Sequence, residues 1–278
     1  MNSLRQLPLG LYEKAISNHL SWEDKLRLTS ASGFDFLEMG IDSTPERLLR
    51  LNSQDTAQQL RHAIETTGVP VRTMALTANR EFPLGSEDPE VHTKALSIVE
   101  KAITFAAETG IRIIHLAGYD EHGTRSNANT KMIFQASIEH CVRRAAGAGV
   151  ILAIETMDTS FMGSCANIIS LCRQIDSPFL QCYADIGNLT ASGIDVKKDL
   201  EIGGKHIVGV HLKDTRPGVY RDILFGDGIV DFDSCLDALQ NIDYAGVLTA
   251  EMWSYDSENF HSYLSLASKF LREKLANH

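Results

Sequence analysis

The sequence predicts an α/β protein built as a single (β/α)₈ barrel, in which parallel strands alternate with helices around one closed sheet. Three observations support this fold. Short apolar runs alternate with longer helical patterns along the chain, no Pro/Ser-rich linker or change of composition divides it, and four successive apolar runs each end on a residue that can bind a metal. Its 278 residues suit one such barrel of about 250 residues, so residues 1–278 are expected to form one domain.

The pattern predicts eight pairs of a strand and a helix. The strands are expected at residues 8–13, 34–39, 71–76, 111–117, 149–155, 179–185, 207–211 and 246–251. The helices are expected at residues 21–33, 44–68, 88–109, 127–148, 164–175, 194–202, 231–240 and 257–274. A doubly wound open sheet would alternate in the same way, but the first turn has no G-x-G-x-x-G motif. The barrel is therefore favoured, and no residue is assigned to an organic cofactor.

Capping residues set the helix boundaries in the first half of the chain. Ser21 precedes an acidic first turn, which is typical of a helix N-terminus. Pro45 takes the first helical position, where a missing backbone N–H has no consequence. Four glycines end a helix and lead directly into the next strand, as C-caps do: Gly33, Gly68, Gly110 and Gly149.

The strands of the second half are short apolar runs that end on a single polar group: Glu155, Asp185, His211 and Glu251. Any one of them could be an ordinary exposed or salt-bridged residue. Four on consecutive strands are harder to explain, because the carboxyl ends of barrel strands meet at the active-site face. Three clustered carboxylates would raise one another's pKa, and a divalent cation removes that repulsion. Three oxygen ligands and one imidazole suit Mn²⁺, Mg²⁺, Co²⁺ or Zn²⁺ alike.

Two more polar residues stand in predicted strands. Glu38 ends the second strand, which should lie away from the four-residue cluster, so it is either a secondary polar contact or a structural residue. His115 stands inside an apolar strand and is expected to be a hydrogen-bonded structural histidine.

The connection after His211 is long and basic, with Lys213, Arg216 and Arg221. A charged loop is usually solvated surface. The loop after the seventh strand is also one that (β/α)₈ enzymes use to bind phosphate. Both interpretations remain open, and the second predicts an anion-binding site beside the metal cluster.

Composition bears on partners and location. The net charge of -10 disfavours nucleic acid and anionic membranes as partners. No run approaches the roughly 20 apolar residues of a membrane helix, and residues 1–20, with polar breaks in their apolar run, are not expected to form a signal peptide. The five cysteines are odd in number and include no C-x-x-C pair, which favours a reducing cytoplasm over a disulfide framework or a zinc knuckle.

The ligand order Glu, Asp, His, Glu resembles that of the xylose-isomerase-like barrels. Within them the chain looks most like the L-ribulose-5-phosphate 3-epimerases (L-xylulose-5-phosphate 3-epimerases) of bacterial L-ascorbate and related pentose pathways. The similarity covers nearly the whole chain, and its motifs are PLGLYEKA, GFDFLEMGID, REFPLGSED, LAGYD, AIETMD, DIGNLTA, HIVGVHLKDTRPG, FGDGIVDF and AEMW. Asn188 stands where free-sugar epimerases and apurinic endonucleases often carry histidine, which fits the phosphopentose branch.

The resemblance implies an isomerase that interconverts L-ribulose 5-phosphate and L-xylulose 5-phosphate. It implies a divalent metal held by Glu155, Asp185, His211 and Glu251. The two glutamates are the outer members of the four-strand arc. They would remove a proton from carbon 3 and return one to the opposite face, through a metal-stabilised enediolate.

Other functions remain as alternatives. They are a free-ketose 3-epimerase or aldose–ketose isomerase on the same scaffold, and a non-catalytic protein that binds a sugar phosphate. An apurinic endonuclease is disfavoured by the acidic charge. Because exposed barrel helices often pair, a homodimer is a further expectation.

Overall fold

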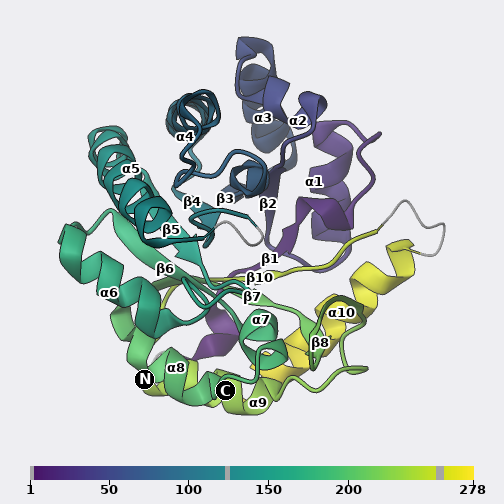
Figure 1. The fold of residues 1–278 in the computed structure, drawn as a ribbon. Helices are drawn as coiled ribbons and strands as arrows, with labels where there is room; N and C mark the ends of the chain where they lie inside the picture. The colour runs from purple at the N-terminus through teal and green to yellow at the C-terminus, as the bar shows by residue number, and fades with distance from the viewer. Residues whose placement is uncertain (1–2, 123–125, 255–259) are drawn as a thin grey trace.

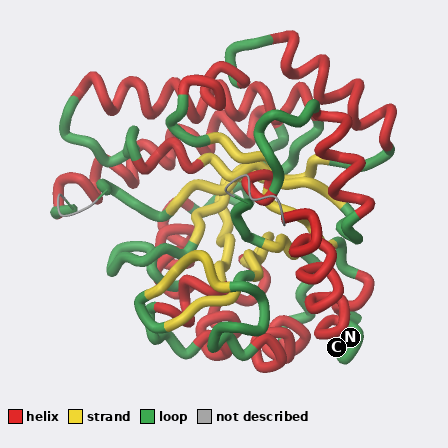
Figure 2. Tube along the Cα trace, turned by 90° about the vertical axis from the view of Figure 1, so that its right-hand side faces the viewer, coloured by secondary structure: helices red, strands yellow, loops and turns green. Residues whose placement is uncertain are grey.

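The computed structural model describes residues 3–122, 126–254 and 260–278. Within these ranges eight parallel strands close into a barrel in the order β1-β10-β7-β6-β5-β4-β3-β2. Figures 1 and 2 show the strands inside a ring of helices. The first and last strands close the barrel, with Leu11 of β1 opposite Ala250 of β10. The predicted (β/α)₈ fold is therefore confirmed.

The barrel strands are β1 (Leu9–Tyr12), β2 (Phe36–Ile41), β3 (Val71–Leu76), β4 (Ile113–Ala117), β5 (Ile151–Glu155), β6 (Leu180–Asp185), β7 (Ile207–Leu212) and β10 (Val247–Ala250). The helices are α1 (Trp22–Ala31), α2 (Pro45–Arg50), α3 (Gln54–Thr67), α4 (Pro89–Thr109), α5 (Ala128–Ala148), α6 (Cys165–Ile175), α7 (Ile186–Ala191), α8 (Val196–Gly203), α9 (Phe232–Asn241) and α10 (Phe260–Leu275). Short 3₁₀ helices are η1 (Leu4–Gln6), η2 (Glu13–Ala15), η3 (Thr77–Arg80) and η4 (Gly204–His206). Within the described part of the chain, no helix has the length and hydrophobicity of a transmembrane span.

The predicted caps are formed. The Ser21 hydroxyl accepts a hydrogen bond from the backbone N–H of Asp24 at the start of α1. Gly68 and Gly110 end α3 and α4 with φ of 70° and 84°, a left-handed conformation that other residues rarely adopt. These local signals therefore fix where the helices end and the next strands begin.

Three segments differ from the prediction. The helix expected over residues 44–68 is split into α2 and α3, because the Ser53 hydroxyl accepts from the N–H of Thr56 and starts a second helix. The Asp185 carboxylate caps the additional helix α7. The basic loop after β7 is folded into an antiparallel hairpin of β8 (Asp214–Arg216) and β9 (Val219–Ile223). Residues 257–259 of the last predicted helix lie outside the described residues.

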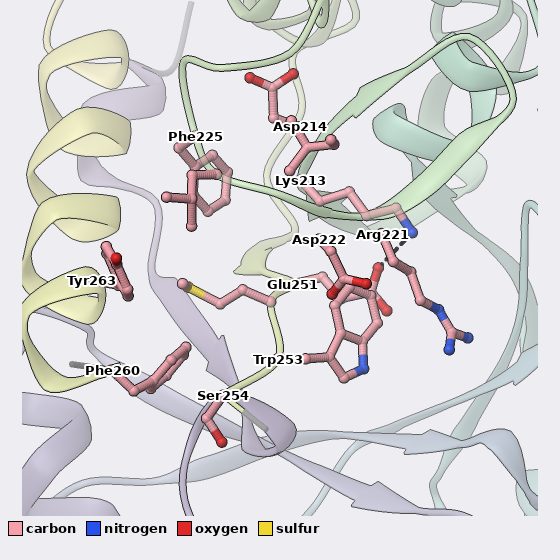
Figure 3. A pocket seen from close by; sticks show the side chains of 13 residues that line it. Lys213, Asp214, Arg221, Asp222, Phe225, Glu251, Trp253, Ser254, Phe260 and Tyr263 are labelled. Atoms are coloured by element: carbon pink, nitrogen blue, oxygen red, sulfur yellow. Dashed lines mark hydrogen bonds and ion pairs between the residues drawn. The ribbon is translucent and has the colours of Figure 1, made fainter. Parts of the chain in front are cut away.

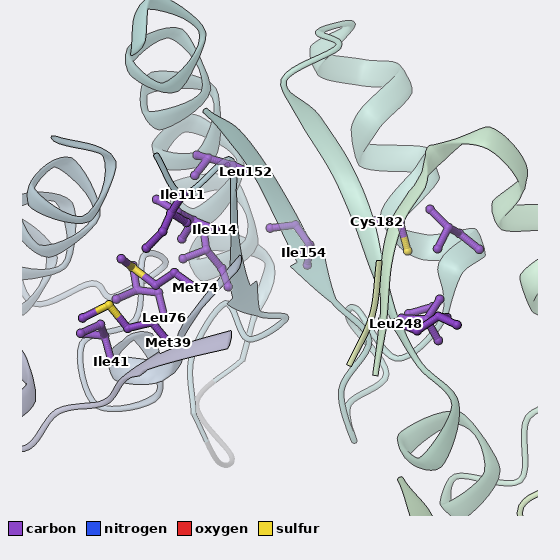
Figure 4. Packing of buried hydrophobic residues seen from close by; sticks show 14 of the residues in the cluster. Met39, Ile41, Met74, Leu76, Ile111, Ile114, Leu152, Ile154, Cys182 and Leu248 are labelled. Carbon is purple, nitrogen blue, oxygen red and sulfur yellow. The ribbon is translucent and has the colours of Figure 1, made fainter. Parts of the chain in front are cut away.

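The two faces of the barrel strands carry different chemistry. Residues such as Met74, Leu152 and Ile154 point outward and pack in the apolar layer between strands and helices (Figure 4). Side chains from opposite strands meet in the interior, where the Tyr183 hydroxyl of β6 donates to Glu38 of β2. A Cβ at Gly209 would lie 2.2 Å from the Tyr183 ring, so glycine leaves the space that this crossing needs. The barrel interior is therefore polar near its carboxyl end.

Candidate functional site

Four side chains gather at the carboxyl ends of neighbouring strands. Glu155 and Asp185 are the last residues of β5 and β6, His211 lies near the end of β7, and Glu251 directly follows β10. One ligand atom from each lies within 4.8 Å of the ligand atoms of the other three. These strands are neighbours in the barrel, as the sequence predicted. The structure therefore brings together all four residues that the sequence singled out for a metal.

Local hydrogen bonds hold Asp185 in place. Its Oδ1 accepts from the backbone N–H of Asn188 at 2.8 Å, and its own N–H donates to the Thr156 hydroxyl at 2.8 Å. The Asn188 amide donates to the backbone carbonyl of Thr156 at 2.8 Å. The motifs AIETMD and DIGN are thus joined, and each supplies one member of the cluster together with a residue that supports the other.

Lys213 belongs to the cluster itself. Its Nζ lies 2.7 Å from Asp185 Oδ2 and 2.8 Å from Glu251 Oε2, and the side chain is buried. Figure 3 shows the ammonium group directed at Glu251. The sequence suggested Lys213 as a phosphate-binding residue, but in the structure its ammonium group faces two carboxylates.

The charges explain the pKa shifts in the cluster. Burial, with the nearby Glu251 and Glu155 carboxylates, raises the pKa of Asp185 to about 7 despite the attraction of Lys213. Burial alone would also raise the pKa of Glu155 and Glu251. The imidazoles of His115 and His211 lower it for Glu155, and Lys213 with His211 lowers it for Glu251. The nearby cations therefore favour ionisation of Glu155 and Glu251, but they do not offset burial and repulsion at Asp185.

The donor set fits a divalent cation. Asp185 Oδ2 is buried and makes no hydrogen bond with any described residue, although the ammonium of Lys213 is its ion-pair partner. Three carboxylates and one imidazole are common ligands of Mn²⁺, Mg²⁺, Co²⁺ and Zn²⁺, and a cation there would relieve the repulsion that raises the pKa of Asp185.

The prediction that Glu38 lies away from the cluster is wrong. Its Oε1 lies 2.6 Å from Nε2 of His211, and its Oε2 accepts from Thr73 and Tyr183. Glu38 is fully buried. The physical reason is the closure of the barrel, since side chains of β2 point into the same interior as those of β7.

His115 is buried, as predicted for a structural histidine, but the predicted hydrogen bonds are not formed. Neither ring nitrogen makes a hydrogen bond with the described residues, and the carboxylates of Glu38 and Glu155 lie 3.4 Å away. The ring stacks on Tyr183 with centroids 4.2 Å apart. Burial would lower the pKa of His115, but the two carboxylates outweigh it and raise the pKa to about 9. His115 is thus a buried cation between two acids.

The remaining predicted cations lie on the hairpin. Arg216 is exposed, and its guanidinium donates to the backbone carbonyl of Asp227. The guanidinium carbon of Arg221 lies 5.1 Å from the centroid of the Trp253 ring. Arg221 and Trp253 line a cavity of about 180 Å³ that reaches Glu251 (Figure 3). Of these two arginines, only Arg221 therefore lies beside the cluster.

A second cavity, of about 320 Å³, adjoins the first through Arg221 and Trp253. It is also lined by Lys14, Arg47 and Asp42. Three cationic side chains therefore border it, but Lys14 and Arg47 lie 2.7 and 3.7 Å from the Asp42 carboxylate. Lys14 and Arg47 come from the segments after β1 and β2, and the sequence analysis singled out neither. Each follows the end of a strand, and this position could have marked it as a candidate for the active-site face. Basic residues are too common at such positions to identify an anion-binding site.

Comparisons with known proteins identify the family of this chain. A family model described as xylose isomerase-like TIM barrel matches residues 26–274. The chain is 42% identical over 273 residues to the L-ribulose-5-phosphate 3-epimerase UlaE of Salmonella paratyphi A and to that of Escherichia coli, covering 98% of this chain and 96% of each relative. A solved structure of an L-ribulose 3-epimerase is similar in fold, with a TM-score of 0.81 at 19% identity, covering 98% of this chain and 95% of that one.

Proposed function

The chain belongs to the xylose isomerase-like TIM barrel family, and there to the L-ribulose-5-phosphate 3-epimerases, and from this premise we propose that it interconverts L-ribulose 5-phosphate and L-xylulose 5-phosphate. As a member it is an isomerase of the carbohydrate epimerase type. The observation that carries the proposal is the gathering of two glutamates, an aspartate and a histidine within 4.8 Å at the mouth of a barrel of this family. Such a set can hold a divalent cation and offers two carboxylates as bases, which suits proton transfer next to a ketone.

Two bases are needed to invert carbon 3. Glu155 and Glu251 come from the first and last of four neighbouring strands, so a sugar lying between them would have one carboxylate on each side. The lowered pKa of each keeps it ionised near neutral pH and able to accept a proton. One glutamate removes the proton of carbon 3. The other, which has first taken a proton from water, gives that proton to the opposite face, and both glutamates return to their starting forms by proton exchange with water. Their roles exchange when the reaction runs backwards.

Asp185 and His211 lie between the two bases and are proposed as ligands only, with Glu155 and Glu251 completing the set of four. A divalent cation held there, Mn²⁺, Mg²⁺, Co²⁺ or Zn²⁺, would supply positive charge beside the oxygens on which the enediolate charge develops. Lys213 adds a fixed positive charge on the Asp185 and Glu251 side. Its ammonium group steadies the ionised form of Glu251 between turnovers.

The phosphate group is proposed to bind near Arg221. The guanidinium of Arg221 makes no hydrogen bond or ion pair in the part of the chain that the structure describes, and it borders the cavity shared with Lys14 and Arg47. Of the other two cations predicted from the sequence, Lys213 faces Asp185 and Glu251, and Arg216 binds a backbone carbonyl. Arg221→Gln should raise KM for the phosphorylated sugar by about 10- to 100-fold, as expected for a lost charged hydrogen bond.

A comparison of phosphorylated and free L-ribulose separates the alternatives. If Arg221→Gln changes KM equally for both sugars, a free-ketose epimerase or isomerase is favoured. Arg216→Gln is the matched control, because it removes the same charge from the same hairpin at a distance from the cluster.

The deciding experiment is turnover in deuterated water. Protein stripped with a chelator is reloaded with Mn²⁺, Mg²⁺, Co²⁺ or Zn²⁺ and incubated with L-ribulose 5-phosphate, and the products are resolved by chromatography and NMR. We expect L-xylulose 5-phosphate labelled at carbon 3, and no product without metal. Binding without turnover would favour the sugar-phosphate binding protein, and turnover without label at carbon 3 would exclude this mechanism.

A cytoplasmic location and a homodimer are part of the same proposal. The five cysteines are buried and free, which suits a reducing compartment. Light scattering of the purified protein would give its oligomeric state.

A further inference from the structure

Glu38 has no part in the proton transfer proposed above, yet it is one of the most completely bonded side chains of the barrel interior. It is fully buried on β2, and its side chain reaches across the barrel interior to His211 of β7. A buried carboxylate without partners would destabilise the protein by several kcal/mol. Its contacts should therefore reveal why a carboxylate is kept there.

Both carboxylate oxygens of Glu38 act as acceptors. Oε2 accepts from the Thr73 hydroxyl at 2.7 Å and from the Tyr183 hydroxyl at 2.9 Å. Oε1 lies 2.6 Å from Nε2 of His211. An ionised carboxylate has no proton to donate, so the hydrogen in this last contact is on Nε2 of the imidazole.

The contact determines what the other nitrogen of His211 can do. A neutral imidazole with its proton on Nε2 carries its lone pair on Nδ1. Nδ1 points to the cluster, 2.9 Å from Glu155, 3.7 Å from Glu251 and 3.9 Å from Asp185. The ring is also held from the side, since the centroids of His115 and Tyr183 lie 4.9 Å from its own. Nδ1 therefore faces the point where the four ligand atoms converge, and a cation bound there would replace the hydrogen through which Nδ1 contacts Glu155 in the metal-free protein.

The same residues could be mistaken for a second cation site, because Glu38, His115 and His211 also come within 4.8 Å of one another. The hydrogen bonds argue against it. Oε2 of Glu38 is already shared by two hydroxyl donors, and Nε2 of His211 is used by Oε1. A cation would have to displace these contacts.

We propose that Glu38 is a positioning residue for His211, and that its acceptor contact with Nε2 fixes the tautomer and ring orientation in which Nδ1 binds the metal. A carboxylate behind a metal-binding imidazole strengthens the ligand in this way, and its loss typically weakens metal binding by about 10- to 100-fold. The inference rests on the proposed function in so far as His211 is a ligand there.

The first measurement is metal affinity, determined with Zn²⁺ or Co²⁺ alone by competition with a coloured chelator. Glu38→Leu should weaken binding by about 10- to 100-fold, and Glu38→Gln, which keeps an acceptor for Nε2, should restore part of it. Thr73→Val is the matched control, because it removes a donor to Oε2 and leaves the contact between Oε1 and His211 intact. Its affinity should stay close to that of the wild type.

The second measurement needs no metal and no turnover. Nitrogen-15 spectra of histidine-labelled protein, with His211 assigned through His211→Asn, should show a proton on Nε2 of His211 in the wild type and in Glu38→Gln. In metal-free Glu38→Leu, the Nε2 proton signal should weaken, because Nε2 has lost its acceptor while Nδ1 still contacts Glu155.

The outcomes separate this inference from the proposed function. Wild-type affinity in Glu38→Leu, or a His211 without a proton on Nε2, overturns the role of Glu38 even if the enzyme epimerises its substrate. If the wild type binds no metal, the proposed metal site fails, and the metal-free spectrum still decides the hydrogen bond. If Glu38→Leu does not fold, metal affinity and the nitrogen-15 spectrum are compared between the wild type and Glu38→Gln.

Discussion

Ile154 and Glu155 are neighbours in β5 but belong to two different regions of the barrel. Ile154 is buried in the apolar layer between the strands and the surrounding helices (Figure 4). Glu155 points into the interior, where it contacts His115 and His211. One residue along the strand thus separates a position in the apolar layer from one surrounded by charges, because successive side chains of a strand point to opposite faces.

The difference shows how stability and chemistry are divided in this molecule. The outer layer depends on shape and apolar area, which stabilise the fold without directional contacts. In the interior, Glu38, Tyr183, Thr249 and His211 are joined by hydrogen bonds that each need a particular partner. Substitutions in the outer layer should therefore change the free energy of unfolding, and those in the interior should change metal binding and turnover.

The largest effect is expected for Glu155→Gln. The change keeps the size of the side chain but removes the base and a proposed metal ligand, so kcat should fall by about 10²- to 10⁴-fold. The free energy of unfolding, measured by urea denaturation, should change far less than in the outer-layer variant below. Steady-state rates at saturating metal give kcat, and Glu251→Gln should behave alike. Near wild-type turnover in both variants would remove the two-base mechanism.

The reverse pattern is expected for Ile154→Ala. Truncating a buried isoleucine should destabilise the protein by about 2–5 kcal/mol, through lost apolar burial and the cavity left behind. Urea denaturation measures this loss. Under native conditions the folded fraction should keep wild-type kcat, since Ile154 does not reach the interior. A tenfold fall in kcat of the folded protein would show that the two faces are coupled.

The fold class and the four clustered residues could be predicted because both depend on signals close together in the sequence. Helix caps such as Ser21 and Gly68 mark the boundaries locally. A strand that stops on Asp185 or His211 places that residue at the carboxyl end of the barrel whatever the rest of the chain does. The positions of these residues could therefore be predicted from the order of strands and helices alone.

The contacts of Glu38 and Lys213 could be seen only in the closed barrel. Whether Glu38 meets His211 depends on side chains reaching across the interior from opposite strands, and the sequence of β2 carries no sign of that distance. Lys213 follows β7 in a basic run that continues to Arg221, so the sequence alone could not tell that its ammonium group turns back to Asp185 while Arg216 points to solvent. Contacts between distant segments, unlike caps, are decided by packing.

Stability should depend on pH through the interior and not through the outer layer. His115 has a folded pKa of about 9, above its unfolded value of about 6.5. The stabilisation from its charge is therefore complete below pH 6.5 and is lost as pH rises through 9. Urea midpoints of metal-free protein should fall over this range, and less in His115→Gln. The pKa of His211 is also raised, so His211 acts in the same direction. The urea midpoint of His115→Gln should therefore still fall with pH, but less steeply than that of the wild type.

An identical pH dependence in the wild type and in His115→Gln would show that His115 is neutral in the folded protein. The control is Ile154→Ala, whose loss of stability should be the same at pH 6.5 and at pH 9, because Ile154 lies in the apolar layer and His115 in the interior.

The smallest effect is expected at Arg216, which belongs to neither region. Its side chain is exposed on β8 and donates to the carbonyl of Asp227. Exposed polar contacts contribute about 0–1 kcal/mol, so Arg216→Gln should change KM for L-ribulose 5-phosphate by less than about fivefold and leave kcat and the urea midpoint nearly unchanged. Steady-state kinetics beside Arg221→Gln test this. A selective tenfold rise in KM for the phosphorylated sugar would instead place the phosphate at Arg216 on the hairpin. The substrate site would then reach beyond the two cavities that border the cluster.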